Sequence, residues 1–277
     1  MNAPLELTGL TKVFDTPAGH LVAVHDVNAQ IRPDEFVCIL GHSGCGKSTV
    51  LSMIAGLEQA TFGGVVIDGR EVREPGPERG VVFQSACLLP WLTARDNVRL
   101  GLARTLKLSR DIAGTRARHY LDLVGVGELA DHLPAALSLG TQQCVSLARA
   151  LSTEPRFLLL DEPFSQLDSL TRFDLQDTLL RVWEETPRIV VMVTHDVDEA
   201  LYVADRLILM TDGPKATVGE ILDVPFPRPR TRGRVLDHTR YYTIRSRVME
   251  FLEHHARQSR SSVLDAVIAS RISAVAS

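Results

Sequence analysis

The clearest pattern along the chain is a set of short apolar runs, each of which ends in polar or glycine-rich residues. Four of these runs lead into Gly41, Gln84, Asp161 and the pair Thr194 and His195. Within each run, apolar residues occupy both odd and even positions, as in strands that are buried on both faces of a parallel sheet. The pattern predicts a doubly wound α/β fold. Its strands are expected at residues 36–40, 81–83, 157–160 and 189–193.

The polar ends of the runs predict the position of a ligand site. Parallel strands all point the same way, so the residues that follow the four runs should gather at one edge of the sheet. In open α/β sheets, ligands bind in the crevice beyond the carboxyl ends of the strands. Gln84, Asp161 and His195 are therefore candidate site residues.

The first run leads into the full G-x-x-x-x-G-K-[ST] pattern of a phosphate-binding loop. Glycines let successive backbone N–H groups wrap around phosphate oxygens, and the helix predicted from Ser48 to Gly56 would direct its N-terminus at the same charge. Lys47 would reach the β- and γ-phosphates, and the Ser48 hydroxyl would ligate Mg²⁺. The alternative, a chance glycine-rich turn, is disfavoured by the strand before the loop and the helix after it. The residues expected to bind nucleotide are Gly41, His42, Ser43, Gly44, Cys45, Gly46, Lys47, Ser48 and Thr49.

A second motif narrows the chemistry, because a phosphate loop alone does not separate kinases, GTPases, motors and transporters. Asp161 ends the third run, and Glu162 follows it. Asp161 is suited to hold Mg²⁺ through water, and Glu162 can polarise the attacking water as a general base. Asp-Glu pairs are also common at solvated helix starts. Behind a buried strand and after a phosphate loop, the pair favours ATP hydrolysis.

Together these residues resemble the ATP-binding subunits of ABC transporters. Gln84 is similar to the Q-loop of that family and His195 to its switch histidine. Residues 137–141 (Leu-Ser-Leu-Gly-Thr) resemble its signature, and residues 165–168 (Ser-Gln-Leu-Asp) resemble its D-loop. Phe14 falls where the family stacks an aromatic ring on adenine, although a single Phe near a strand is as often part of the core.

The resemblance extends from about residue 5 to about residue 222 and implies an architecture. It implies a P-loop NTPase (RecA-like) parallel-sheet core, with an N-terminal antiparallel β subdomain and a helical subdomain at about residues 88–150. We therefore expect a nucleotide-binding domain over residues 1–222 and a C-terminal Pro/Arg-rich connector and helical extension over residues 223–277.

The resemblance also implies that two such subunits pair head to tail, with each ATP between the phosphate loop of one and the signature of the other. ATP binding then favours the closed pair, and hydrolysis weakens it. In that scheme His195 holds the γ-phosphate and orients the attacking water, and Gln84 touches Mg²⁺ and relays closure to a membrane partner. The catalytic set would be Glu162, His195 and Gln84, the Mg²⁺ ligands Ser48, Gln84 and Asp161, and the further nucleotide contacts Ser138, Gly140 and Asp168.

The signature departs from the family pattern, which has two adjacent glycines after the serine. Leu139 replaces the first glycine, and Thr141 takes the last position. Because the Cβ of leucine disfavours positive φ, Leu139 is expected to crowd a backbone that must approach phosphate closely. In the D-loop, Ser165 and Gln166 replace the small residues of the family. We expect slow hydrolysis with ATP binding intact.

The transported solute is inferred from resemblance alone. Residues 87–98 are similar to those of importers of nitrate, cyanate, taurine and alkanesulfonates, although Trp91 can equally be a core aromatic. The phosphate loop and residues 168–172 favour the nitrate and cyanate branch. We therefore expect the ATPase of an importer for a small oxyanion, with nitrate first and nitrite or cyanate next.

Three alternatives remain open: a sulfonate or taurine importer ATPase, a soluble ABC ATPase that acts on DNA or the ribosome, and a module that binds ATP without turnover. Soluble members usually carry two cassettes or a long inserted coiled coil, which 277 residues with one phosphate loop do not fit. The altered residue Leu139 keeps the third alternative open.

The implied partners are a second ABC ATPase subunit, identical or paralogous, two transmembrane permeases and, indirectly, a periplasmic binding protein. Nucleic acid is not expected as a partner, because 30 Lys and Arg against 34 Asp and Glu give a net charge of −4. The four scattered cysteines predict neither a disulfide framework nor a zinc site. The chain begins without the layout of a signal peptide and lacks an apolar stretch of the ~20 residues that span a bilayer. The expected location is peripheral, at the cytoplasmic face of the inner membrane.

After Asp223 the composition changes. Prolines alternate with arginines, which predicts an extended connector, and apolar residues at helical spacing then predict a helix at about residues 240–257. Seven arginines between residues 228 and 247 are interpreted as a solvated basic face, with contact to anionic lipid headgroups or a regulatory protein as the alternative. From Gln258 onward, the sequence fits a short second helix or a mobile tail.

Overall fold

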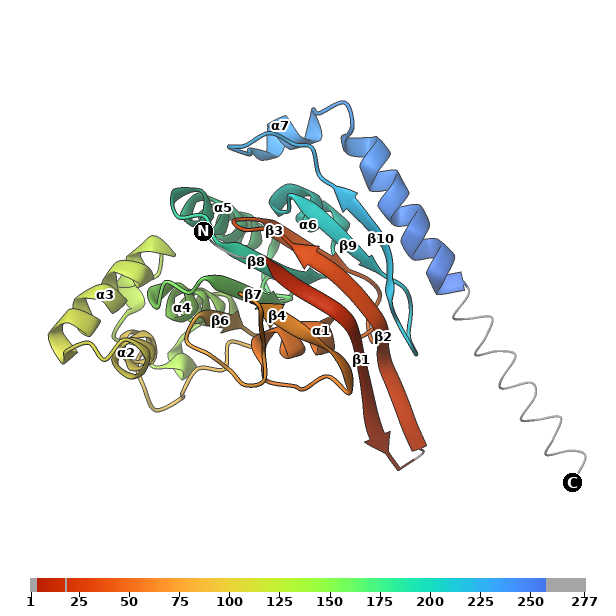
Figure 1. Cartoon of the computed structure of the whole chain (residues 1–277). Coiled ribbons are helices and arrows are strands. Elements are labelled where there is room, and N and C mark those ends of the chain that lie inside the picture. Colours follow the sequence, from red (N-terminus) through yellow and green to blue (C-terminus); the bar gives the residue numbers. More distant parts are fainter. Residues whose placement is uncertain (1–3, 18, 258–277) are drawn as a thin grey trace, which may run out of the picture.

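Two sheets and the helices packed on them make up the fold, which we describe from a computed structural model covering residues 4–17 and 19–257 (Figure 1). The larger sheet has the strand order β10-β9-β3-β8-β7-β6, in which only β10 runs antiparallel to its neighbour. Its strands are β3 (Phe36–Leu40), β6 (Arg79–Val82), β7 (Phe157–Asp161), β8 (Ile189–Thr194), β9 (Arg206–Met210) and β10 (Val218–Asp223). The four strands expected from the apolar runs are confirmed, and β6 begins slightly earlier than expected.

The smaller sheet is antiparallel, with the order β2-β1-β4-β5. It packs on one face of the larger sheet through a core in which Val37 and Ile39 of β3 meet Leu5 of β1 and Ile54 of helix α1. The expected N-terminal antiparallel β subdomain is therefore confirmed. The elements are β1 (Leu5–Thr16), β2 (Gly19–Ile31), β4 (Phe62–Ile67), β5 (Arg70–Glu71) and α1 (Lys47–Ala55).

Helices cover the opposite face of the larger sheet. Because successive side chains of a strand point to opposite faces, alternate residues of each strand pack against these helices. Phe36, Cys38 and Leu40 of β3 are fully buried in this second core. The expected helical subdomain corresponds to α2, α3 and α4, which lie together at the outer end of the molecule in Figure 1. The helices are α2 (Ala94–Thr105), α3 (Arg110–Leu123), α4 (Leu139–Ser152), α5 (Ser169–Glu185) and α6 (Val197–Val203), with 3₁₀ turns η1 (Gly127–Leu129) and η2 (Pro134–Ala136).

The C-terminal segment returns to the core instead of extending away from it. Residues 224–231 are irregular, α7 (Arg232–Leu236) follows, and residues 241–257 form a helix beside β10 (Figure 1). Tyr241, Ile244 and Val248 are buried against the α5 and α6 side of the larger sheet. The helix expected at about residues 240–257 is confirmed, whereas the second helix or tail from Gln258 lies outside the described residues.

The interpretation of the C-terminal arginines as a solvated face is wrong for Arg230, which is buried, whereas Arg234, Arg240 and Arg247 are exposed as expected. Arg230 has a side chain that is only 1% exposed, and it donates to the carbonyl oxygens of Tyr202 (3.0 Å) and Ala204 (2.7 Å). These carbonyls lie at the end of α6, where a helix leaves acceptors without intrahelical partners. The arginines that form ion pairs in this segment are Arg228, Arg230, Arg232, Arg245 and Arg247.

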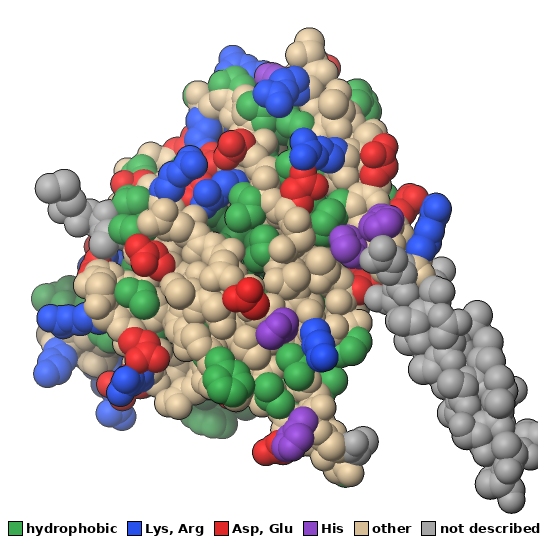
Figure 2. All heavy atoms as spheres, turned by 45° about the vertical axis from the view of Figure 1, so that its right-hand side comes forward, with side chains coloured by type: hydrophobic (Ala, Val, Ile, Leu, Met, Phe, Trp, Pro, Cys, Tyr) green, Lys and Arg blue, Asp and Glu red, His purple; other side chains and the backbone are tan. Residues whose placement is uncertain are grey.

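The surface in Figure 2 carries basic and acidic side chains interspersed, without one sign dominating the face in view. A field of mixed sign attracts a polyanion weakly. Among the helices of residues 4–17 and 19–257, none has both the length and the apolar character needed to cross a bilayer.

Candidate nucleotide site

Four neighbouring strands, β3, β8, β7 and β6, carry the candidate residues at their carboxyl ends. Ser48 Oγ donates to Asp161 Oδ1 at 2.8 Å. Glu162 Oε2 lies 3.2 Å from His195 Nδ1 and accepts a 3.4 Å hydrogen bond from Gln84 Nε2. The expectation that the strand ends converge is confirmed, and we call Ser48, Gln84, Asp161, Glu162 and His195 the strand-end group.

The phosphate loop connects β3 to α1 without a side-chain cap on the helix. Gly46 precedes the helix with φ 90°, and a Cβ at this position would lie 2.4 Å from Val24 Cγ1, so only glycine fits. Lys47 is buried and donates from Nζ to the carbonyl oxygens of Gly41 (2.8 Å) and His42 (2.9 Å). The N–H groups of the first turn of α1 have no intrahelical acceptors and are therefore available to an anion.

Two further contacts border the loop. His42 Nδ1 lies 2.8 Å from Asp212 Oδ1, which ties the loop to the segment after β9 and was not foreseen from the sequence. Phe14 is half-buried on β1, with Lys12 Nζ 5.0 Å from its ring centroid. Phe14 pairs with Leu21 in the β1–β2 hairpin. Val24 of the same β2 strand packs against Gly46 of the phosphate loop, so this hairpin borders the loop.

Asp161 and Glu162 sit in different environments although they are adjacent. Burial raises the pKa of Asp161, and the neighbouring Glu162 raises it further, while the hydrogen bond from Ser48 lowers it. Glu162 has φ 44°, a left-handed conformation that is uncommon for a residue with a side chain, and its N–H donates to Val193 O at 2.9 Å. Such backbone strain concentrates at functional sites, where the surrounding structure over-determines it.

The oxygen donors fit Mg²⁺. Ser48 Oγ and Asp161 Oδ1 are 2.8 Å apart, and hard oxygen ligands of this kind suit Mg²⁺, which typically takes one or two carboxylates together with substrate phosphates. Within the described part of the chain, no group of three or more His, Cys, Asp or Glu side chains could hold a metal on its own.

Helix α4 holds the segment that follows β6, a support that sequence reasoning missed. Gln143 is buried and donates from Nε2 to Phe83 O (3.0 Å). Arg149 donates from Nη1 to Cys87 O and from Nη2 to Ala86 O, both at 2.9 Å. The backbone on both sides of Gln84 is thus fixed by one helix. The available signal was the pair of long polar side chains, Gln143 and Arg149, within a helix that is mostly apolar or small on its buried side.

The signature-like residues and Asp168 lie at the starts of α4 and α5. Ser138 caps α4, accepting from Thr141 N at 3.1 Å. Asp168 caps α5, accepting from Leu170 N and Thr171 N at 3.1 Å, and the hydrogen bonds from Thr171 lower its pKa. A Cβ on Gly140 would lie 3.4 Å from Thr171 Cγ2, so the two helix starts touch. The starts of α4 and α5 are therefore in contact. The hydrogen bonds of Ser138 and Asp168 each stay within one helix start.

Leu139 does not adopt the positive φ on which the expected crowding was based. Leu139 is the first residue of α4 and is absent from the described residues with positive φ. Helical φ is negative, so a Cβ is tolerated there. The side chain is 62% exposed and points away from the packed core. The side chain is therefore accessible to a second molecule.

A phosphate loop between a buried strand and a helix, with a carboxylate at the end of a neighbouring parallel strand, defines a P-loop NTPase. Residues 24–165 match the family model described as ABC transporter. The chain is 49% identical over 242 residues to the nitrate import ATP-binding protein NrtD of Synechococcus elongatus, covering 87% of this chain and 88% of that protein. It is 44% identical over 249 residues to the bicarbonate transport ATP-binding protein CmpD of the same species, covering 90% of each. The chain therefore belongs to the ABC transporter family.

A solved structure agrees with this assignment. The dimeric ATP-binding cassette MJ0796, in a post-hydrolysis state bound to ADP and Pi, superposes with a TM-score of 0.73 at 34% identity. The match covers 98% of that chain and 79% of this one, so this chain carries residues without a counterpart in MJ0796. The chain is an ATP-binding and ATP-hydrolysing cassette.

Proposed function

We propose that the chain energises an ABC importer for a small oxyanion, with nitrate as the solute. The observation that carries the catalytic half of this proposal is the meeting of Gln84, Glu162 and His195 beside the phosphate loop. A water molecule among these three polar groups and the γ-phosphate would have a base, an orienting imidazole and an amide around it.

Each residue of the strand-end group has a proposed role. The phosphate loop and Lys47 hold the ATP phosphates. Ser48, Asp161 and Gln84 hold Mg²⁺, which neutralises charge on the phosphate oxygens. Glu162 polarises the attacking water, and His195 holds the γ-phosphate and orients that water. The left-handed backbone of Glu162 supports its role, because strain of this kind persists only where neighbouring contacts fix the residue.

The second half of each site is proposed to come from a second ATPase subunit, identical or paralogous. Ser138, Gly140 and Asp168 would contact the nucleotide held by that partner, and Phe14 would stack on adenine within its own subunit. The surface position of Leu139 and the ordered cap on α4 support a site that is completed by another molecule. Transmembrane permeases and, indirectly, a periplasmic binding protein are the further partners, with the chain peripheral at the cytoplasmic face of the membrane.

Residues 1–222 are proposed as the nucleotide-binding domain and residues 223–277 as the C-terminal extension. Nitrate is proposed on the similarity to NrtD. Bicarbonate is the second candidate, because CmpD is also similar over most of the chain. Both solutes are small oxyanions, and the strand-end group would serve either importer equally.

Reconstitution decides between the solutes. The full chain is assembled in proteoliposomes with its transmembrane permeases and periplasmic binding protein, and ATP hydrolysis is measured with nitrate or bicarbonate supplied to the binding protein. Stimulation by nitrate, abolished in Glu162→Gln, is the expected result. Stimulation by bicarbonate alone would replace nitrate as the solute, and an assembled complex without ATP turnover would contradict the proposal.

A further inference from the structure

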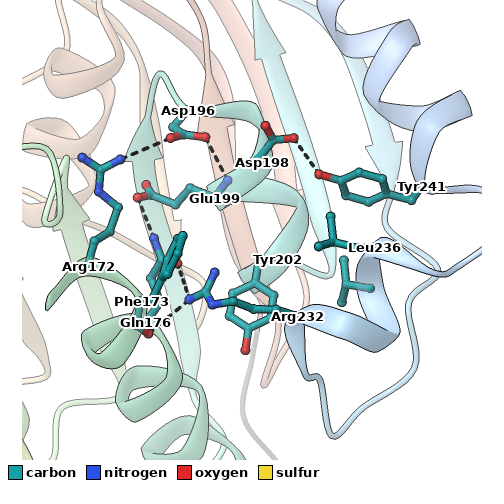
Figure 3. A pocket seen from close by; sticks show the side chains of 11 residues that line it. Arg172, Phe173, Gln176, Asp196, Asp198, Glu199, Tyr202, Arg232, Leu236 and Tyr241 are labelled. Atoms are coloured by element: carbon teal, nitrogen blue, oxygen red, sulfur yellow. Dashed lines mark hydrogen bonds and ion pairs between the residues drawn. The ribbon is translucent and has the colours of Figure 1, made fainter. Parts of the chain in front are cut away.

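A cavity of about 300 Å³ lies where α5, α6, α7 and the C-terminal helix meet (Figure 3). Helix α6 begins only two residues after His195, so the cavity borders the loop that carries the proposed switch residue. Figure 3 shows Arg232, Gln176 and Glu199 following one another from α7 toward α6. The side chains that line the cavity include Arg172, Gln176, Glu199, Tyr202, Arg232 and Tyr241.

Glu199 is a buried carboxyl on the inner side of α6, with 7% of its surface exposed. Its Oε2 accepts a 3.0 Å hydrogen bond from Gln176 Nε2 on α5. Burial raises the pKa of this carboxyl, and the nearby Thr194 side chain lowers it. Thr194 ends β8 and directly precedes His195. Thr194 Oγ1 accepts a 3.1 Å hydrogen bond from Asp196 N, which connects the two residues on either side of His195.

Arg232 of α7 fixes the amide of Gln176. Its Nη2 donates to Gln176 Oε1 at 2.9 Å, while its guanidinium lies 3.9 Å from the ring centroid of Phe173 and 4.2 Å from that of Tyr202. A guanidinium only donates hydrogen bonds, so it holds the oxygen of the amide toward itself and the N–H₂ toward Glu199. Hydrogen bonds arranged in such a chain polarise and strengthen one another.

The C-terminal helix adds a second attachment to the start of α6. Tyr241 Oη donates to Asp198 Oδ1 at 2.7 Å, and Arg245 Nε donates to the same oxygen at 2.6 Å. Asp198 is in the first turn of α6, three residues after His195. The C-terminal segment therefore contacts α6 at two places. Tyr241 and Arg245 bind Asp198 in its first turn, and Arg232 is connected to Glu199 through Gln176.

A third contact links the switch loop to the D-loop from the other side of the cavity. Arg172 of α5 donates from Nη2 to Leu167 O at 3.2 Å and from Nη1 to Asp196 Oδ2 at 3.5 Å. Asp196 caps α6 by accepting from Glu199 N at 3.0 Å. A displacement of α6 would thus move Asp196 and, through Arg172, the backbone at Leu167 in the D-loop.

Building on the proposed role of His195, we propose that Glu199 and Gln176 are positioning residues for that histidine, and that the C-terminal segment sets its position through Arg232. None of the three touches nucleotide. They act by fixing the end of β8 and the first turn of α6, from which the imidazole projects. A small displacement of a catalytic group from productive geometry costs turnover far more than it costs substrate binding.

The test compares Arg232→Met with Arg234→Ala in the full chain. Methionine keeps an apolar stem between Phe173 and Tyr202 but removes the donor to Gln176, together with the hydrogen bonds to Phe173 O and Asp177 Oδ1. Arg234 is an exposed arginine of the same helix and serves as the control. ATP turnover is measured at a protein concentration that supports pairing. We expect kcat to fall about tenfold in Arg232→Met with KM for ATP changed less than about twofold, kcat to stay unchanged in Arg234→Ala, and Arg232→Lys to restore most of the turnover.

A double variant separates positioning from general stabilisation. Gln176→Leu removes the next link, so Arg232→Met combined with Gln176→Leu should lose no more turnover than either alone, because the two residues act through one chain. Equal kcat in Arg232→Met and Arg234→Ala, or multiplicative losses in the double variant, would overturn the inference while leaving the proposed function intact. A wild type without any turnover would overturn the proposed function itself, and this inference with it.

Discussion

The strand-end group and the signature-like residues both lie near helix starts, yet they rest on different supports. The first group stands at the ends of four neighbouring strands, with Glu162 in contact with Gln84 and His195. Ser138 and Leu139 stand at the surface start of α4, held by its own first turn. Under the proposed function, one half of the site is assembled within this chain, whereas the other half would present its residues to the nucleotide of a second subunit.

The largest expected effect tests whether the strand-end group performs the chemistry. Glu162→Gln removes the base but keeps a side chain of the same shape, so we expect turnover to fall about 1000-fold. ATP binding should persist, and the ATP-bound pair should accumulate, which size-exclusion chromatography with ATP detects. Glu185→Gln on exposed α5 surface is the matched control. Turnover within tenfold of wild type in Glu162→Gln would exclude this carboxylate as the base.

The next effect concerns binding within one subunit. Lys47 donates to the Gly41 and His42 carbonyls and is already positioned over the loop. Since a hydrogen bond to a charged group contributes about 2 kcal/mol, Lys47→Ala should weaken ATP binding about 30-fold. Titration with a fluorescent ATP analogue measures this, with the exposed Lys107→Ala as control. Unchanged affinity in Lys47→Ala would remove the lysine from phosphate binding.

The strand-end group and the phosphate loop could be predicted from the sequence, whereas the conformation of Leu139 and the contacts of Arg232 could not. The strand ends could be foreseen because strands buried on both faces are apolar at every position, and the phosphate loop requires glycine where Gly46 adopts positive φ. The conformation of Leu139 could not be judged, because sequence alone does not tell whether α4 begins at this residue, with helical φ, or after it. Arg232 was missed for another reason. Its partners, Gln176 and Asp177, lie on a helix far away in sequence, so composition alone made it look solvated.

A smaller effect examines the layer beneath the strand-end group. Burial raises the pKa of Glu199 from its ordinary value of 4.5 to about 7. Between these values the folded chain keeps a proton that the unfolded chain has released, so stability falls as pH rises through this window. Glutamine does not titrate. Between pH 5.5 and pH 8, the wild type should therefore lose about 2 kcal/mol more unfolding free energy than Glu199→Gln.

Urea unfolding at the two pH values measures this difference. Glu185→Gln, which removes a carboxylate from the exposed surface, should follow the wild type at both. Parallel pH dependences for wild type and Glu199→Gln would mean that Glu199 is ionised in both states, and that its burial imposes no proton uptake.

The smallest effect addresses the signature half directly. Leu139 is 62% exposed on a helical backbone, so it disturbs nothing within its own chain. If its side chain faces the nucleotide of a second subunit, Leu139→Gly should let the N–H groups at the start of α4 approach that phosphate, and raise turnover about threefold at concentrations that support pairing. Affinity for ATP in the dilute, unpaired chain should stay the same, because the strand-end half is untouched. Ile112→Ala, which trims an exposed apolar side chain on α3, should change neither quantity. Lower turnover in Leu139→Gly would instead mean that the leucine makes a favourable contact with its partner, and that the departure from the family pattern is an adaptation to a specific second subunit.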